Sequence, residues 1–360
     1  MMRCKYFSIL LFLALGLTAC SEGRDLEGQG NMDVPSVVAQ METTPVTSKG
    51  DAADDPAIWV HPTSPEKSLI LGTDKKSGLY LYNLAGDVVD FQKIGRVNNV
   101  DIRQNLNADY FSGYRNLSAS SNRSTNAVDL VAVSGEGKLD LLGSFPVQDD
   151  PYGLCVGSIS DGKSLTVLVN YKSGLFELYA VAFPEGRLTA EKMAAYQLGG
   201  QLEGCVIDDA RQQIFIGEEE KGIWRFDLPR GKMTLSAPVF FVGLTDETGL
   251  VADVEGLDLY IKGNQRYLVA SSQGDFTYVI FRVDDGGQLQ KVSKFRIGNN
   301  DRLDVDAVEE TDGLTVTSLP LGAAYPEGVL LVQDGMNKPT SQNFKLVDWR
   351  EIMKLIKDKQ

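Results

Sequence analysis

The chain has 360 residues, with 49 acidic against 35 basic side chains, a net charge of −14 and a single histidine. This acidic balance argues against a nucleic-acid surface, because phosphate backbones are bound by basic patches. The single histidine, His61, argues against histidine acid phosphatases, Ser-His-Asp hydrolases and histidine-rich zinc sites.

The N-terminal segment has the pattern of a targeting signal. Basic residues at Arg3 and Lys5 precede an apolar run over 6–17, which ends in Leu-Thr-Ala-Cys at Cys20. We predict a lipoprotein signal peptide over residues 1–19, lipidation at Cys20 and a flexible tether over 20–35. The alternative is an ordinary secretory signal with an incidental cysteine. We therefore expect an exported bacterial lipoprotein that faces the periplasm or lies at the outer membrane, with the lipid as its only membrane contact.

Short apolar runs alternate with Gly, Asp, Asn and Ser turns along the rest of the chain, which is typical of an all-β protein. A glycine followed by an apolar strand recurs at Gly78, Gly174 and Gly222. Turn-plus-strand openings recur near residues 55, 99, 152, 203, 255 and 312, at a spacing of roughly fifty residues. This period predicts a six-bladed β-propeller over residues 36–360.

The two ends of this domain have separate roles. The strand around residues 37–46 has no earlier partner, so we predict that it closes the ring by completing the final blade. Residues 348–357 have the pattern of a short amphipathic C-terminal helix packed outside the propeller.

Each blade places the start of its first strand and the end of its second strand at the same rim. The first-strand openings carry most of the carboxylates, and four cations follow second strands: Lys75, Lys76, Arg123 and Lys172. Carboxylates at this density repel one another unless cations offset them, and Ca²⁺ prefers oxygen ligands. The basic side chains suit phosphate oxygens. Metal ions with Lys and Arg clamps are what phosphoryl transfer requires.

Several segments resemble the β-propeller phytase family, over about residues 42–349. They are Asp51-Ala-Ala-Asp-Asp-Pro-Ala-Ile-Trp59, Asn98-Asn-Val-Asp-Ile-Arg103, Ser121-Asn-Arg-Ser124 and Asp253-Val-Glu-Gly-Leu257. The resemblance implies a 3-phytase type enzyme that releases phosphate from the calcium complex of phytate, myo-inositol hexakisphosphate. It also implies several bound Ca²⁺ ions and direct attack by a calcium-bound water without a phosphoenzyme. We further expect a monomer with no nucleic-acid partner.

The resemblance also implies a role for individual residues. The implied calcium ligands are Asp54, Asp55, the carbonyls of Pro56 and Val100, Glu203, Glu219, Asp253, Glu255, Gln273, Asp306, Asp312 and Asn337, with Glu42 as a further candidate. The implied phosphate-binding residues are Lys75, Lys76, Arg123, Tyr152 and Lys172. The implied catalytic residues are Lys76, Arg123, Glu203 and Glu219.

The sequence departs from the family pattern at two positions where an acidic residue is expected, Ser173 and Met336. Each departure removes a possible calcium ligand, so we expect one ion to be lost or held more weakly. A longer loop over residues 105–118 is predicted to lie near Arg123, where it would reshape substrate access.

Cys155 and Cys205 lie at equivalent positions of adjacent repeats, fifty residues apart. They either form a disulfide in an oxidising compartment or remain buried thiols. Because propeller strands are often too far apart for the Cα separation of a disulfide, we expect buried thiols.

Two other functions compete with the phytase interpretation. A propeller lactonase uses one metal ion with few carboxylates and needs no lysine cluster, so the four rim cations argue against it. A non-enzymatic binding propeller would hold calcium only for stability.

Overall fold

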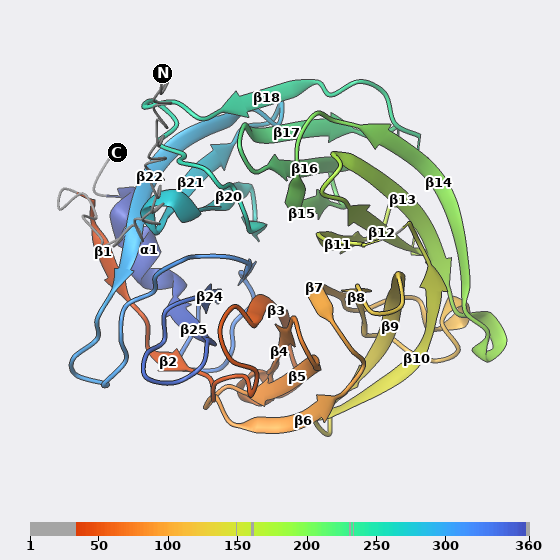
Figure 1. Cartoon of the computed structure of the whole chain (residues 1–360), viewed down its shortest axis with the longest axis horizontal. Helices are drawn as coiled ribbons and strands as arrows, with labels where there is room; N and C mark the ends of the chain where they lie inside the picture. The colour runs from red at the N-terminus through yellow and green to blue at the C-terminus, as the bar shows by residue number, and fades with distance from the viewer. Residues whose placement is uncertain (1–33, 149, 160–161, 230–231, 233, 358–360) are drawn as a thin grey trace, which may run out of the picture.

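A computed structural model describes residues 34–148, 150–159, 162–229, 232 and 234–357. Six β-sheets surround a central channel, and the first strand of each sheet faces the centre (Figure 1). These inner strands, β3, β7, β11, β15, β19 and β23, contact one another in turn, and β23 returns to β3. The predicted six-bladed propeller is confirmed.

The blades follow the chain in order, and strands that follow one another in the chain pair antiparallel within each blade. Blade one has β3 (Ala53–Trp59), β4 (Leu69–Asp74), β5 (Gly78–Asn83) and β6 (Val88–Gln92); blade two has β7 (Val97–Arg103), β8 (Leu117–Asn122), β9 (Ala127–Ser134) and β10 (Lys138–Pro146). Blade three has β11 (Leu154–Gly157), β12 (Leu165–Asn170), β13 (Leu175–Ala182) and β14 (Thr189–Gln197); blade four has β15 (Leu202–Asp208), β16 (Gln213–Glu218), β17 (Gly222–Asp227) and β18 (Phe240–Gly243). Blade five has β19 (Leu257–Lys262), β20 (Gln265–Ser272), β21 (Thr277–Val283) and β22 (Leu289–Gly298); blade six has β23 (Leu314–Thr317), β24 (Val329–Asp334) and β25 (Asn343–Asp348). Short 3₁₀ turns are η1 (Pro65–Lys67), η2 (Ala108–Tyr110), η3 (Pro184–Gly186) and η4 (Gln273–Asp275).

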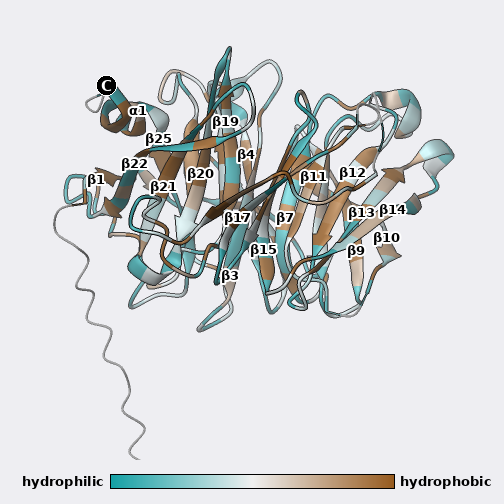
Figure 2. Cartoon of the chain, turned by 90° about the horizontal axis from the view of Figure 1, so that it is seen from above, coloured by the Kyte–Doolittle hydropathy of each residue, from teal (hydrophilic) through white to brown (hydrophobic). Residues whose placement is uncertain are grey.

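The hydrophobic core lies between neighbouring blades. Strands such as β4 and β12 are buried along their whole length, because each sheet is covered on both faces by its neighbours. The outermost strands β6, β10 and β14 are partly exposed and more polar. Apolar residues accordingly concentrate within the strands (Figure 2). Packing of sheet against sheet thus fixes the positions of the loops at both rims.

The N-terminal segment is shared between two blades. β2 (Met41–Glu42) pairs with β25 and completes the final blade, as predicted. β1 (Ser36–Val38) instead pairs in parallel with β22 and adds a fifth strand to blade five. This second pairing, at the start of the predicted segment, was not predicted. Because one segment pairs with both blades, it closes the ring and also ties blade five to blade six.

The C-terminal helix α1 (Trp349–Lys357) confirms the predicted amphipathic segment. Its buried residues Trp349, Ile352 and Ile356 pack on the core between blades five and six. The Trp349 ring stacks on Tyr260 with 3.9 Å between ring centroids. Within the described residues, no helix has the length and apolar character needed to cross a membrane. The predicted signal peptide, Cys20 and nearly all of the predicted tether lie outside the described residues.

The structure corrects the expectation for the cysteines. Cys155 in β11 and Cys205 in β15 form a disulfide, with 5.7 Å between their Cα atoms. The inner strands of adjacent blades converge at the channel, so their separation here falls within disulfide range. The prediction of two buried thiols is therefore wrong.

The loop over residues 105–118 lies at the other rim from Arg123. It joins the end of β7 to the start of β8, where Arg103 pairs with Leu117. Arg123 follows the last residue of β8, Asn122, which pairs with Val97 at the start of β7. A loop from the first to the second strand of a blade must lie opposite the rim where the second strand ends. The predicted effect of this loop on access at Arg123 is therefore wrong.

Candidate active site

A cavity of about 1340 Å³ opens at the rim where the first strands begin. Residues from five of the six blades line this cavity, so the cavity forms only when the ring of blades closes. The predicted site residues along its wall are Lys75, Tyr152, Glu219, Asp253, Glu255, Gln273, Asp312 and Asn337.

Three inner strands carry the same irregularity at this rim. The register of β3 shifts between Ala53 and Pro56, that of β7 between Val97 and Val100, and that of β15 between Leu202 and Cys205. A β-bulge of this kind turns a side chain out of the regular alternation of a strand. Asp54, Asn98 and Glu203 are the first residues inside these three shifts. Equivalent positions in blades one, two and four therefore deliver their side chains to one place.

Five of the buried carboxylates form two overlapping groups. Asp54, Glu203 and Asp312 have carboxylate oxygens within 4.8 Å of one another, and so do Glu203, Glu219 and Glu255. Buried oxygens of Glu203 (Oε2), Glu219 (Oε1) and Glu255 (Oε2) have no hydrogen-bond partner among the described residues. Glu203 belongs to both groups and so joins them into one cluster.

Burial and mutual repulsion change the protonation of this cluster. Burial, followed by the charge of Asp54, raises the pKa of Glu203 to about 7. Burial, followed by the charge of Glu203, raises the pKa of Glu219 to about 8. The pKa values of Glu255 and Asp312 are raised for the same two reasons, with Glu203 and Asp54 as the respective neighbours. The cluster therefore favours any bound cation that stabilises its ionised form.

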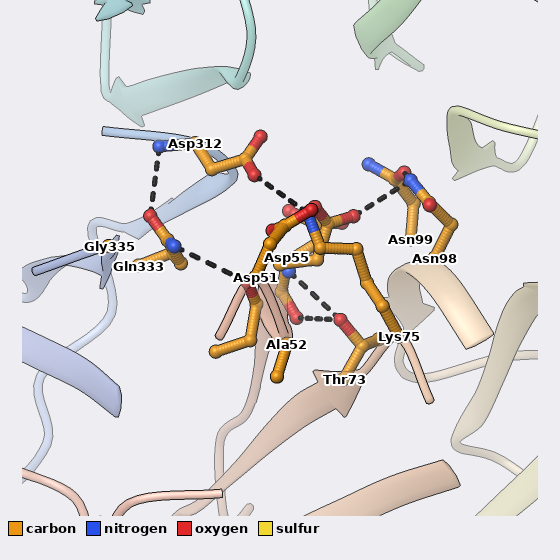
Figure 3. Close-up of polar contacts among 12 residues, drawn as sticks. Asp51, Ala52, Asp55, Thr73, Lys75, Asn98, Asn99, Asp312, Gln333 and Gly335 are labelled. Carbon is orange, nitrogen blue, oxygen red and sulfur yellow. Dashed lines mark hydrogen bonds and ion pairs between the residues drawn. The ribbon is translucent and has the colours of Figure 1, made fainter. Parts of the chain in front are cut away.

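Lys75 is the cation that contacts this cluster (Figure 3). Its Nζ lies 2.9 Å from Oδ1 of Asp54, 3.3 Å from Oδ2 of Asp312 and 2.6 Å from Oδ1 of Asp51. Although burial disfavours its charged form, Asp54 and Asp312 raise the pKa of Lys75 above its usual range. Lys75 is therefore charged at every physiological pH.

Three other predicted phosphate-binding residues gather around one aromatic ring. The Nζ of Lys172 lies 4.2 Å from the centroid of the Tyr152 ring, and the guanidinium carbon of Arg123 lies 5.6 Å from it. Arg123 also binds Asp150 with two bonds, 2.6 Å from Nε to Oδ1 and 2.9 Å from Nη2 to Oδ2. Lys76 is exposed and donates to the carbonyl of Lys49. Lys172 is exposed too, so these cations can reach a ligand from solvent.

Asp55, Pro56 and Val100 lie deeper than the other predicted ligands. They line a narrow cavity of about 30 Å³ in the channel, together with Cys155 and Cys205. The Oδ2 of Asp55 accepts a bond of 3.1 Å from the backbone N–H of Val100. Burial, followed by the charge of Asp54, raises the pKa of Asp55. The structure thus separates this set from the rim cavity.

Asp306 lies with a different cation. It pairs with Lys345, which is completely buried and lies 2.8 Å from Oδ2 of Asp334 and 3.7 Å from Oε2 of Glu42. Lys345 also donates a hydrogen bond of 3.0 Å from its Nζ to the carbonyl of Ala307. Asp306 and the further candidate Glu42 therefore sit at the seam where β2 meets β25, and neither lines the rim cavity.

The two positions that depart from the family pattern differ in location. Met336 lines the rim cavity next to Asn337, and offers a thioether where calcium prefers oxygen. Ser173 is exposed, and its carbonyl accepts a bond of 2.7 Å from Gln197.

Three polar residues at this rim were not predicted as functional. Asp51 and Asp150 pair with Lys75 and Arg123, and Asn98 contacts both Asp54 and Glu203. Asn98 lies within a segment that carries the family resemblance. An alignment of the blade openings in the register of their bulges would have placed it with Asp54 and Glu203.

Comparison with known proteins identifies relatives of this chain. The model of the family described as Phytase matches residues 8–360. A 3-phytase of Bacillus subtilis (strain 168) is 36% identical over 334 residues, which cover 88% of this chain and 84% of that protein. A crystal structure of a protein from Lactobacillus plantarum superposes with a TM-score of 0.53 at 12% identity. It covers 84% of this chain and 81% of that one, and at this identity it supports the fold alone.

Proposed function

This chain belongs to the phytase family and hydrolyses phytate, and we propose that this hydrolysis depends on several calcium ions held by the rim carboxylates. The observation that carries the proposal is the set of buried, unpartnered carboxylate oxygens on Glu203, Glu219 and Glu255. A buried polar atom without a partner is costly. A hard cation that takes oxygen ligands fits this donor set.

The proposed ligands at the rim are Asp54, Glu203, Glu219, Asp253, Glu255, Gln273, Asp312 and Asn337, and in the channel Asp55 with the carbonyls of Pro56 and Val100. Calcium held there would offset the repulsion among the carboxylates, polarise the phosphoryl oxygens and lower the pKa of the attacking water. Asp306 and Glu42 each pair with Lys345 through one carboxylate oxygen. We therefore propose that they bind calcium only through the other carboxylate oxygen.

The chain's own cations hold the substrate. Arg123 presents its guanidinium beside Tyr152, where it binds two phosphate oxygens, and Lys172 adds charge close to the same ring. Lys76 contributes a mobile charge from blade one. Lys75 neutralises carboxylates on the side of the cluster facing the cavity. Their joint effect is to hold a highly anionic substrate against an acidic rim.

Glu219 is positioned to orient a water for attack on phosphorus. Its Oε1 is buried and has no hydrogen-bond partner in the part of the chain that the structure describes, and the residue lines the cavity. Calcium held by the neighbouring carboxylates would stabilise the ionised form of Glu219, and an ionised carboxylate can accept a proton from that water. His61 follows β3, at the end opposite the rim cavity, and its Nδ1 accepts bonds from the N–H groups of Thr63 and Ser64. These placements support direct attack by water without a phosphoenzyme.

Phosphate release from phytate, with and without calcium, tests the proposal. We expect a chelator to abolish release and added Ca²⁺ to restore it. Lys76→Met and Arg123→Met should reduce turnover strongly while the melting temperature in calcium stays close to wild type. Release that survives exhaustive chelation would refute calcium dependence. Unchanged turnover in both variants would refute the role of Lys76 and Arg123 in holding the substrate. No phosphate release from wild type in calcium would favour a binding propeller, and lactone hydrolysis without phosphate release would favour the lactonase alternative.

The N-terminal sequence supports a proposal for location. We propose that the enzyme is exported as a monomeric lipoprotein tethered through Cys20, because small residues precede that cysteine after an apolar run. Cys20→Ala should move the protein from the membrane fraction to the soluble fraction. Retention of that variant in the membrane fraction would contradict lipid anchoring at Cys20.

A further inference from the structure

We propose that Asn98 is a positioning residue for phytate hydrolysis. Its side-chain amide joins the carboxylate cluster to the phosphate-binding Arg123. The inference rests on the proposed function of this rim. Asn98 is completely buried and lies in the bulge of β7, at the position that Asp54 occupies in β3 and Glu203 in β15. Figure 3 shows it beside Asn99, facing the strand that carries Asp55. Blade two therefore supplies a neutral amide where blades one and four supply carboxylates.

The donor side of this amide spans two carboxylates. Its Nδ2 lies 2.8 Å from Oδ2 of Asp54, 2.8 Å from Oε1 of Glu203 and 2.9 Å from Oδ1 of Asn99. An amide nitrogen carries two N–H bonds, so three acceptors share two hydrogens, and the two carboxylates are the stronger acceptors. Bonds to charged acceptors are stronger than neutral ones. Asn98 thus fixes the spacing of two groups that repel each other and that are proposed to share calcium.

The acceptor side of the same amide faces the phosphate-binding residues. Its Oδ1 accepts a bond of 3.3 Å from Nη1 of Arg123. The Nε and Nη2 groups of Arg123 donate hydrogen bonds to the carboxylate of Asp150, which is half exposed. Arg123 is therefore held between a buried neutral acceptor and an exposed charged one. When phosphate takes the place of Asp150, the bond to Asn98 still sets the direction of the guanidinium.

Only a side chain with a donor and an acceptor can serve both sides. Aspartate at this position would lose the donor and bring another negative charge into the cluster. Alanine would lose both functions and add no charge. Because aspartate keeps an acceptor for Arg123 and alanine does not, the two substitutions separate the positioning of Arg123 from the spacing of the carboxylates.

The test compares wild type with Asn98→Ala, Asn98→Asp and the control Asn105→Asp, which adds the same charge at an exposed position near the other rim of blade two. The measurements are kcat and KM for phytate at saturating calcium, and the melting temperature with and without calcium. For Asn98→Ala we expect kcat to fall about tenfold to a hundredfold and KM to rise, as for the loss of bonds to charged groups. For Asn98→Asp we expect a similar loss of kcat, a lower melting temperature without calcium and a larger increment on adding calcium. The control should match wild type.

A wild-type kcat and KM in Asn98→Ala would overturn the proposal, whatever Asn98→Asp does. A purely structural role predicts the same fall in melting temperature with and without calcium, and unchanged kcat and KM. If Asn98→Asp does not fold without calcium, the alanine variant and the calcium-loaded aspartate variant decide the question. Failure of the proposed function has a separate result, because wild type itself would then be indifferent to chelation.

Discussion

Removal of calcium should make the stability of this protein fall as the pH rises. In the folded chain, burial chiefly raises the pKa of Glu203 to about 7 and that of Glu219 to about 8. In an unfolded chain a glutamate titrates near pH 4.3, at about the value for model peptides. The folded state therefore binds these two protons more tightly than the unfolded state does.

The sign and size of the effect follow from this difference. Stability from each proton is fully present below about pH 4.3 and is lost as the pH rises through the folded pKa. For Glu203 the shift from 4.5 to about 7 corresponds to about 3 kcal/mol lost by pH 8. A loss of this size lowers the melting temperature of a large domain by roughly 5 °C or more. Glu219 adds to the loss between neutral pH and about pH 8.

The assay is thermal unfolding by circular dichroism between pH 5 and 9, after calcium has been removed by dialysis, with a parallel series in excess Ca²⁺. We expect the melting temperature of the dialysed protein to fall across this range. In calcium it should stay nearly level, because the ion stabilises the ionised carboxylates. Glu203→Gln should flatten the dialysed series, since its amide does not titrate. Equal slopes with and without calcium, or a full slope in Glu203→Gln, would refute this reasoning.

Three further predictions concern single contacts. Asp150→Asn should lower KM for phytate, because the bidentate pairing of Asp150 with Arg123 competes with phosphate; a raised KM in steady-state assays would contradict this. Lys345→Met should cost about 3–5 kcal/mol of unfolding free energy in calcium, since it leaves the buried carboxylate of Asp334 unpaired, whereas Lys354→Met on the exposed face of α1 should be close to neutral in the same denaturant titration. A denatured, unreduced chain without residues 1–33 should show no free thiol on titration, because Cys155 and Cys205 are paired; two thiols per chain would refute the pairing.

The blade count was predictable from the sequence because each blade repeats a local pattern. A glycine opens the third strand in blades one, three and four, at Gly78, Gly174 and Gly222. Each has a positive φ of 155°, 80° and 136° respectively, and a Cβ there would lie 2.0 to 2.8 Å from a backbone oxygen. The backbone at these positions requires glycine, so a glycine recurs in the sequence in these repeats. Spacing therefore predicted the propeller.

Contacts between different blades produce no comparable pattern in the sequence. β1 has three residues, and its parallel pairing with β22 depends on where the closed ring places that edge. The pairing of Cys155 with Cys205 depends on how closely the inner strands converge. Spacing also leaves the equivalence of positions in different blade openings uncertain by one residue, and only the register shift at each bulge shows which residues are equivalent. For this reason Asn98 lay inside a recognised motif and yet its equivalence to Asp54 and Glu203 appeared only in the register.

The two sets of carboxylates, around Lys345 and at the rim, show why calcium suits one place and a lysine the other. At the seam, Lys345 is completely buried and contacts Asp306, Asp334 and the carbonyl of Ala307, so the cation is part of the chain and holds parts of blade six together permanently. At the rim, by contrast, oxygens of the glutamate cluster have no partner among the residues that the structure describes, beside a cavity lined by Glu219 and Glu255. A cation fixed by covalent bonds cannot adjust to a substrate whose charge falls with each phosphate released. A diffusible ion can, which is the physical reason to expect exchangeable calcium where substrate binds and a built-in ammonium where the N-terminal strand β2 completes blade six.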